Sequence, residues 1–201
     1  TGRGLSLVAN KQGQPTELWR FDGQAWSRFA SAWLTASGRN APAVAFDARR
    51  SVLVVHGGDV GGQPLGDTWE WDGTSWRQRT SGGPLPRGRH EMVFDAVRAE
   101  VVLFGGLGTN GVRYGDTWIW NGTYWQERFG VAGPSVRYDP RLFFDPVRGR
   151  VVLFGGRNST ELTDSFDWDG TAWTAHAPAI RPPDIGPITR DTARGVAVAL
   201  I

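Results

Sequence analysis

Short apolar runs recur along the chain at a nearly constant spacing. Four-residue apolar stretches begin at Val52, Val101 and Val151, and a Gly-Gly pair follows each of them closely. Continuous β-branched runs are typical of strands that are covered on both faces. Farther along each segment, tryptophans alternate with other residues at a period of two, which places both indoles on one face of a strand. The pattern predicts an all-β chain.

Two sequence blocks keep the same period through the chain. Four aromatic blocks have first residues that lie 50, 49 and 48 positions apart, and they begin at Trp19, Trp69, Trp118 and Phe166. In three units a Phe-Asp pair lies 11 residues ahead of the Gly-Gly pair, at Phe46, Phe94 and Phe144. Because two independent markers share one period over three cycles, we interpret the chain as an array of repeats.

Each repeat predicts four short strands. Strand one ends at the Phe-Asp pair, and a turn leads into the apolar strand two, whose Gly-Gly end permits positive φ and close backbone approach. Strand three carries the tryptophan alternation, and an Asp-Gly or Asn-Gly turn leads into strand four. Counted over all units, including the partial ones at both ends, the pattern predicts seventeen strands.

A single sheet of this kind has apolar surface on both faces, and it therefore needs neighbours to be stable. We expect the tryptophans that recur at strand positions to fill the space between stacked sheets as a structural core. These tryptophans are Trp69, Trp71, Trp76, Trp118, Trp120, Trp125, Trp168 and Trp173.

The Phe-Gly-Gly end of strand two, the Asp-Thr-Trp openings at Asp67 and Asp116 and the final tryptophan of each block resemble kelch repeats. The resemblance covers essentially the whole chain, and it departs where His56 replaces the Phe before Gly-Gly and where Phe166 replaces Trp. It implies an all-β, kelch-type β-propeller of four-stranded antiparallel blades, in a single domain of residues 1–201 with four repeats plus one extra strand visible. The repeats span approximately 1–42, 43–90, 91–140 and 141–187, with a partial one at 188–201.

The number of blades in the ring stays open. Kelch rings commonly have six or seven blades, so the resemblance implies that the chain is part of a larger ring. The alternative is a closed ring of four blades, in which the carboxyl-terminal strands complete the first blade and one second strand is left over.

The composition narrows the classes of function. The formal charge is only +2, and the arginines are scattered singly, whereas a nucleic-acid footprint would cluster them, so we expect no nucleic-acid partner. The absence of cysteine excludes disulfides and thiolate ligands. No apolar stretch reaches the ~18 residues that a membrane helix needs, which predicts no membrane insertion. His56, His90 and His176 have unrelated places in the repeat, so the sequence predicts no metal site and no cofactor.

Because the strands alternate in direction, the long and variable loops lie on one side, which we call the long-loop face. It comprises residues 27–40, 59–66, 77–89, 107–115, 126–140, 157–163 and 174–187. Variable loops on a rigid scaffold are where binding residues usually lie. The loop residues that break the repeat are therefore the better candidates for recognition, and they include Arg113, Tyr114, Tyr138, Arg157 and Trp33.

Three arginines do repeat, and they have two interpretations. Arg39, Arg87 and Arg137 each lie seven residues before the Phe of the Phe-Asp pair, which places them near the channel of the implied ring. One interpretation is a ring of guanidinium groups that grips an acidic ligand through bidentate hydrogen bonds. The favoured interpretation is structural, because a residue that repeats with the blade is explained by bonds to backbone carbonyls between blades.

The sequence favours a non-catalytic binding scaffold whose long-loop face recognises a protein partner. Trp33, a tryptophan in a loop, raises the alternative of a carbohydrate-binding propeller. A less favoured hypothesis is an isomerase or lyase that acts on an acidic sugar through the repeated arginines. An extracellular or cell-surface location is favoured, and a cytoplasmic one stays open.

Overall fold

A computed structural model of the chain describes residues 4–8, 17–21, 24–29, 39–79, 82–129, 132–176, 188–191 and 196–199. These residues form antiparallel sheets and no α-helix. Three sheets have four strands each, the sheet before them has three strands, and a two-stranded hairpin follows them. This all-β arrangement confirms the expected order of strands, and it adds one short hairpin, β6–β7, after the first Gly-Gly pair.

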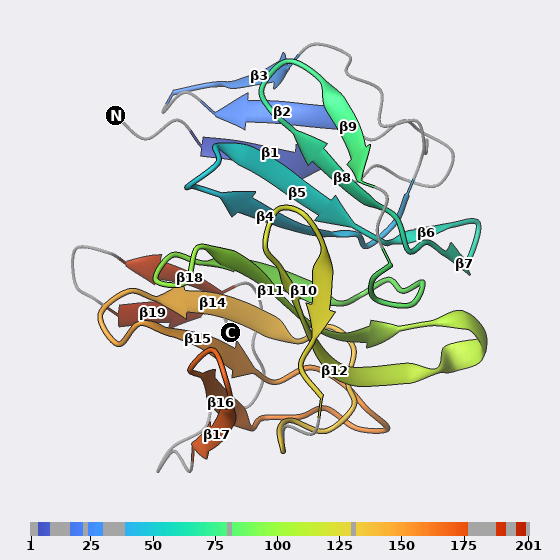
Figure 1. The fold of residues 1–201 in the computed structure, drawn as a ribbon, viewed down its shortest axis with the longest axis vertical. Coiled ribbons are helices and arrows are strands. Elements are labelled where there is room, and N and C mark those ends of the chain that lie inside the picture. The colour runs from blue at the N-terminus through green and yellow to red at the C-terminus, as the bar shows by residue number, and fades with distance from the viewer. Residues whose placement is uncertain are drawn as a thin grey trace.

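The sheets follow one another in chain order (Figure 1). Sheet I contains β1 (Gly4–Val8), β2 (Glu17–Phe21) and β3 (Trp26–Phe29). Sheet II contains β4 (Ala43–Asp47), β5 (Val52–His56), β8 (Thr68–Trp71) and β9 (Trp76–Arg79), with the hairpin of β6 (Asp59–Val60) and β7 (Gln63–Pro64) beside it. Sheet III contains β10 (Glu91–Asp95), β11 (Glu100–Leu107), β12 (Arg113–Trp120) and β13 (Trp125–Glu127), with the 3-10 turn η1 (Thr109–Gly111) between β11 and β12. Sheet IV contains β14 (Arg141–Asp145), β15 (Arg150–Phe154), β16 (Ser165–Trp168) and β17 (Trp173–His176), and the last hairpin contains β18 (Ile188–Asp191) and β19 (Val196–Ala199).

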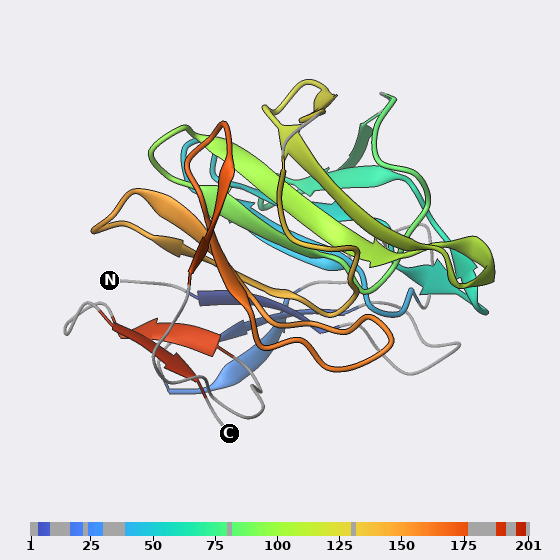
Figure 2. The ribbon, with the colours of Figure 1, turned by 90° about the horizontal axis from the view of Figure 1, so that it is seen from below.

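The first strands of sheets II to IV are neighbours, because β10 contacts both β4 and β14. We call these three strands the first-strand row. The β6–β7 hairpin and the tip between β11 and β12 project on the same side of the molecule in both views (Figures 1 and 2). The short turn between β14 and β15 lies on the opposite side in Figure 1. The long loops after the Gly-Gly pairs thus share one face.

The apolar second strands are buried on both faces, as the sequence pattern predicts. In β11, Val101 and Leu103 belong to the hydrophobic cluster shared with sheet II. Val102 and Phe104 belong to the cluster shared with sheet IV. Successive residues of a strand point to opposite faces, so an unbroken apolar run is what a sheet needs when it is packed between two others.

The tryptophans of the repeated blocks lie between the sheets. The structure buries Trp71, Trp120, Trp125, Trp168 and Trp173 and half-buries Trp69, Trp76 and Trp118. The indole Nε1 of Trp125 donates a 2.8 Å hydrogen bond to Thr68 Oγ1 of the preceding sheet. A Cβ atom at Gly83 would lie 2.6 Å from Trp125 Cδ1, so glycine at this position leaves room for the indole. The tryptophans therefore join neighbouring sheets by both packing and hydrogen bonds.

One sequence-based expectation about the loops is wrong. The segment 107–115 was expected to be a loop, but β11 continues to Leu107 and β12 already begins at Arg113, so Arg113 and Tyr114 lie in a strand. The register shifts between Phe104 and Gly106, which is a bulge that lets the ladder pass the glycine pair instead of ending there. Trp33 lies outside the described residues.

Candidate functional site

The repeated arginines are buried, and each is paired with an aspartate of the scaffold. Arg87 is 0% exposed, and its guanidinium donates hydrogen bonds of 2.6 and 2.8 Å to the two oxygens of Asp116. Its Nη1 also donates to the carbonyl oxygen of Gly105, at 3.0 Å. The same contacts recur twice, for Arg39 with Asp67 and Gly57 and for Arg137 with Asp164 and Gly155. These contacts fit the structural interpretation, because no ligand reaches a guanidinium that is buried against its own carboxylate.

Two of the carboxylates that accept these hydrogen bonds, Asp67 and Asp116, have lowered pKa values. Burial by itself would raise the pKa of Asp116, but the hydrogen bonds from Arg87 and from the indole of Trp118 outweigh it, and the pKa is lowered. In sheet IV, Phe166 replaces the tryptophan, and the guanidinium of Arg137 lies 5.6 Å from the centre of its ring. In sheet III the aspartate accepts a hydrogen bond from an indole, whereas in sheet IV the ring of Phe166 lies beside the arginine.

A line of backbone hydrogen bonds crosses the loop-side ends of the first-strand row. It joins the residues two positions after each repeated arginine: Arg89 N donates to Ala41 O at 3.0 Å, and Asp139 N donates to Arg89 O at 2.8 Å. All three residues have positive φ, 44° at Ala41, 56° at Arg89 and 51° at Asp139. A non-glycine residue in this conformation costs on the order of 1 kcal/mol or more. Because the conformation recurs in all three units, at Ala41 as well as at Arg89 and Asp139, it belongs to the repeat.

The side chains at this end of the row are charged, and they do not repeat. Arg89 forms an ion pair with Asp139, and its guanidinium lies over the ring of Tyr138, 4.5 Å from the ring centre. Two residues farther along the chain, Glu91 begins β10 and Arg141 begins β14. The Oε2 atom of Glu91 lies 3.8 Å from the Nη1 atom of Arg141. We call Arg89, Glu91, Asp139 and Arg141 the charged cluster.

Glu91 is the member of the charged cluster whose pKa is shifted toward neutrality. Burial raises the pKa of its carboxyl group to about 7, Asp139 also raises it, and Arg141 lowers it without cancelling the effect of burial. The side chain is nevertheless 29% exposed, so it exchanges protons with solvent. Carboxyl groups with strongly shifted pKa values cluster at functional sites, which makes Glu91 a candidate site residue.

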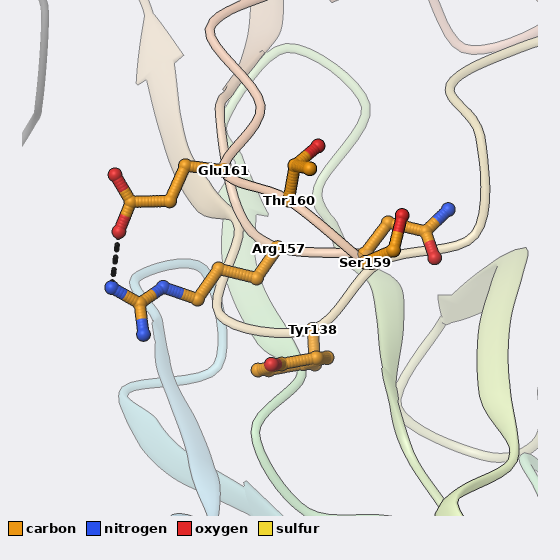
Figure 3. Close-up of a pocket in the computed structure, with 6 residues that line it drawn as sticks. Tyr138, Arg157, Ser159, Thr160 and Glu161 are labelled. Carbon is orange, nitrogen blue, oxygen red and sulfur yellow. Dashed lines mark hydrogen bonds and ion pairs between the residues drawn. The ribbon is translucent and has the colours of Figure 1, made fainter.

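A pocket of about 260 Å³ adjoins the cluster on the long-loop face (Figure 3). It is lined by Tyr138, Arg157, Asn158, Ser159, Thr160 and Glu161. The backbones of Tyr138 and Arg157 exchange two hydrogen bonds of 3.0 and 2.8 Å, which fix one wall of the pocket. Arg157 and Glu161 form an ion pair, and both side chains are about half exposed. Since Arg89 packs on Tyr138, the pocket and the charged cluster form one continuous surface.

The structure brings together only some of the residues that the sequence singled out. Tyr138 and Arg157 meet in the pocket. Tyr114 instead packs under the buried guanidinium of Arg87, 4.0 Å from ring centre to Cζ, and Arg113 is exposed at the start of β12. Sequence reasoning missed four residues of this surface, which are Arg89, Glu91, Arg141 and Glu161. The signal for three of them was present: positions two and four residues after the repeated arginine differ from unit to unit.

Two histidines are buried where sheets II and III meet. His56 ends β5 and His90 precedes β10, and their ring centres lie 5.4 Å apart. The Nδ1 atom of His56 is 2.9 Å from Thr68 Oγ1, and the ring packs edge-on against Trp125. Within the described segments, no group of three or more His, Cys, Asp or Glu residues is placed to hold a metal ion. The histidine pair is therefore part of the packing between sheets.

The histidine pair predicts an acid-sensitive stability. Burial, together with the charge of Arg87, lowers the pKa of His56 from 6.5 to about 3 and that of His90 well below 6.5. The unfolded chain keeps ordinary histidine pKa values, so below pH 6.5 it binds protons that the folded chain does not. Stability that is complete above pH 6.5 is lost as the pH falls toward the folded pKa, by about 1.4 kcal/mol per pH unit for each histidine.

The test compares the wild type with His56→Phe, since phenylalanine occupies this position in sheets III and IV as Phe104 and Phe154. Urea unfolding at several pH values between 6 and 4 should show a slope smaller by about 1.4 kcal/mol per pH unit in the variant. Glu91 contributes with the opposite sign, because its folded pKa is raised, but it contributes equally to both proteins. Equal slopes in the two proteins would contradict the prediction.

Comparison with known proteins adds no relationship to this picture: no model of a protein family matches the chain, and neither does any curated protein. Among the described residues, no helix is long and apolar enough to cross a membrane.

Proposed function

We propose that the chain is a non-catalytic binding module that recognises a protein partner through its long-loop face. One observation carries the proposal: the repeated arginines are bonded to aspartates of the scaffold, whereas the non-repeating Arg89, Tyr138, Arg157 and Glu161 lie together on this face. Exposed arginine and tyrosine side chains on a rigid scaffold are typical of protein interfaces. The pocket of about 260 Å³ is also smaller than most small-molecule sites, which favours a side chain of a partner as its occupant.

We propose that the scaffold is part of a kelch-type β-propeller that forms one domain. Three observations support this architecture: four-stranded sheets repeat in chain order, their first strands are adjacent, and the line through Ala41, Arg89 and Asp139 follows those strands. In such a ring the first-strand row would line the axis, and the charged cluster would stand at the mouth of the channel. A larger ring and an extracellular or cell-surface location remain predictions of the sequence.

The test uses paired variants on opposite faces. The site variant combines Tyr138→Ala and Arg157→Ala in the pocket. The control combines Val97→Ser and Val147→Ser, two exposed residues in the short turns that follow β10 and β14. Cross-linking of the full chain in an extract of its native source, read by mass spectrometry, should identify a partner cross-linked to the long-loop face. The site variant should weaken its binding at least tenfold, as loss of interface hot spots does, and the control should not. Cross-links on the short-turn side, or equal loss in both variants, would contradict the proposal.

A carbohydrate ligand is the second candidate, and the chemistry of the pocket supports it. The pocket is lined by the ring of Tyr138, the amide of Asn158, the hydroxyls of Ser159 and Thr160 and an ion pair, which together offer stacking and hydrogen bonds. A glycan array with Tyr138→Ala as control tests this candidate, and the absence of a Tyr138-dependent signal would remove it. The isomerase or lyase hypothesis has no such support, because the arginines on which it relied are buried against aspartates.

A further inference from the structure

Arg141 differs from the buried arginines in its surroundings. Its side chain is 41% exposed, and its one ion pair among the described residues is with Glu91, at 3.8 Å. This separation is longer than a hydrogen bond. A guanidinium carries five N–H donors in a planar fork that matches a carboxylate bidentately. Arg141 thus presents an anion-binding group at the loop-side end of the first-strand row.

The neighbouring elements determine the charge around Arg141. β4 and the segment before it contribute Ala43 and Ala41 at the equivalent positions, and so add no charge. The other two strands and the segments before them contribute Arg89, Glu91, Asp139 and Arg141, while the buried His90 stays neutral because burial lowers its pKa. β14 also contacts β18 (Ile188–Asp191), but the residue of that unit equivalent to Arg141 lies outside the described residues. The charged cluster is therefore neutral when Glu91 is ionised, and it carries one positive charge when Glu91 is protonated.

We propose that the charged cluster binds a carboxylate of the partner protein, an Asp or Glu side chain, and that Glu91 takes up a proton from solvent on binding. The ligand carboxylate accepts two hydrogen bonds from the guanidinium of Arg141. An ionised Glu91 at 3.8 Å from that guanidinium would repel the incoming anion, whereas a protonated Glu91 donates a hydrogen bond through its new O–H. No covalent bond forms or breaks other than the O–H bond on Glu91. This inference rests on the proposed function, because it assigns one chemical group to the partner.

The cluster also carries a cost that the scaffold does not require. Glu91 is held where burial disfavours its ionised form. Alanine at the corresponding places of the β4 unit, Ala41 and Ala43, shows that the repeat does not need these charged side chains. Ionisable groups that burial shifts in this way cluster at functional sites.

The experiment is calorimetric titration of the full chain with a blocked tetraglutamate peptide, with tetraglutamine as the matched neutral peptide and sodium acetate as a free carboxylate. The glutamate peptide should bind about tenfold more tightly at pH 6 than at pH 8, because a group with a pKa of about 7 is mostly ionised at pH 8. Repeating the titration at pH 8 in buffers of different ionisation enthalpy should show uptake of close to one proton. Tetraglutamine should not bind, and acetate that binds as tightly as the peptide would overturn a protein carboxylate as the ligand.

Three variants make the outcome decisive, each first checked for folding by circular dichroism at both pH values. Glu91→Gln should bind tetraglutamate at pH 8 as tightly as the wild type does at pH 6, with no proton uptake. Arg141→Gln should weaken binding at pH 6 at least tenfold, whereas Arg77→Gln, an exposed arginine on β9, should leave it unchanged. Binding that survives Arg141→Gln, or a pH dependence that survives Glu91→Gln, overturns the inference. If tetraglutamate fails to bind but the Tyr138 and Arg157 variant still loses a partner, the proposed function stands and this inference alone falls.

Discussion

Replacing Trp120 with alanine is expected to lower the free energy of unfolding by about 3 to 5 kcal/mol, as large-to-small changes in a packed core do. Trp120 is 0% exposed and belongs to the cluster that joins sheets II and III. Its ring packs on Trp125 at 5.4 Å between centres, and its Nε1 donates a 2.9 Å hydrogen bond to Glu70 of the preceding sheet. The substitution therefore opens a cavity and also removes a hydrogen bond between sheets. Urea unfolding followed by far-ultraviolet circular dichroism measures the loss.

Two controls separate packing from hydrogen bonding. Tyr124→Ala, in the same hairpin but half exposed, should change the unfolding free energy by no more than about 0.5 kcal/mol. Trp168 is equally buried but its Nε1 has no hydrogen-bond partner among the described residues, because Ile119 occupies the place of Glu70. Trp120→Phe should therefore cost about 1 kcal/mol more than Trp168→Phe. A cost under about 0.5 kcal/mol for Trp120→Ala would contradict the view that tryptophans fill the space between sheets.

Replacing Arg87 with alanine is expected to cost about 3 to 5 kcal/mol of unfolding free energy, because it leaves a carboxylate without its buried partner. Arg87 bonds Asp116 and the carbonyl oxygens of Gly105 and Leu85, so one guanidinium satisfies three groups from different segments. Asp116 is 21% exposed, so water recovers part of the loss, and the lower end of the range is expected. Thermal and urea unfolding give the value directly.

Arg89, two residues away, is the matched control. It is 41% exposed in its pair with Asp139, and pairs of this kind contribute about 0 to 1 kcal/mol. Arg89→Ala should therefore leave the free energy of unfolding nearly unchanged. Because both variants lose one positive charge, a difference between them does not come from the net charge. If Arg87→Ala were as mild as Arg89→Ala, the assignment of the repeated arginines to the scaffold would fail.

The contrast between Arg87 and Arg89 shows how structural and recognition residues are interleaved in one segment. Arg87 points into the space between sheets and bonds a repeated aspartate. Arg89 has positive φ, and its side chain lies over Tyr138 beside the pocket. Both residues are arginines in the same loop, so in the sequence only repetition along the chain distinguishes one from the other. Arg87 has counterparts in Arg39 and Arg137, whereas Arg89 has none.

Local sequence patterns were sufficient to predict where the strands lie and which of them are covered on both faces. The Phe-Asp pairs, the apolar runs and the Trp-x-Trp alternation determined where strands lie along the chain, and the continuous runs such as that at Val101 determined that both faces are covered. These features depend on neighbours within a few residues, which is the range over which alternation and turn chemistry act. The extension of β12 back to Arg113 was not predictable in the same way, since it depends on a bulge that pairs with β11 across the glycine pair.

The candidate site, in contrast, was decided by tertiary structure. Glu91 and Arg141 lie in two repeats, 50 positions apart in sequence, and they become neighbours only because β10 and β14 lie side by side. The raised pKa of Glu91 likewise comes from burial at that contact and from no local motif. By itself the sequence determined the repeat, its strands and the indoles between sheets, because these are short-range periodic properties. Which charges meet, and which of them remain open to a ligand, was decided only when the repeats packed against one another, because an electrostatic site depends on distances between segments that are remote in the chain.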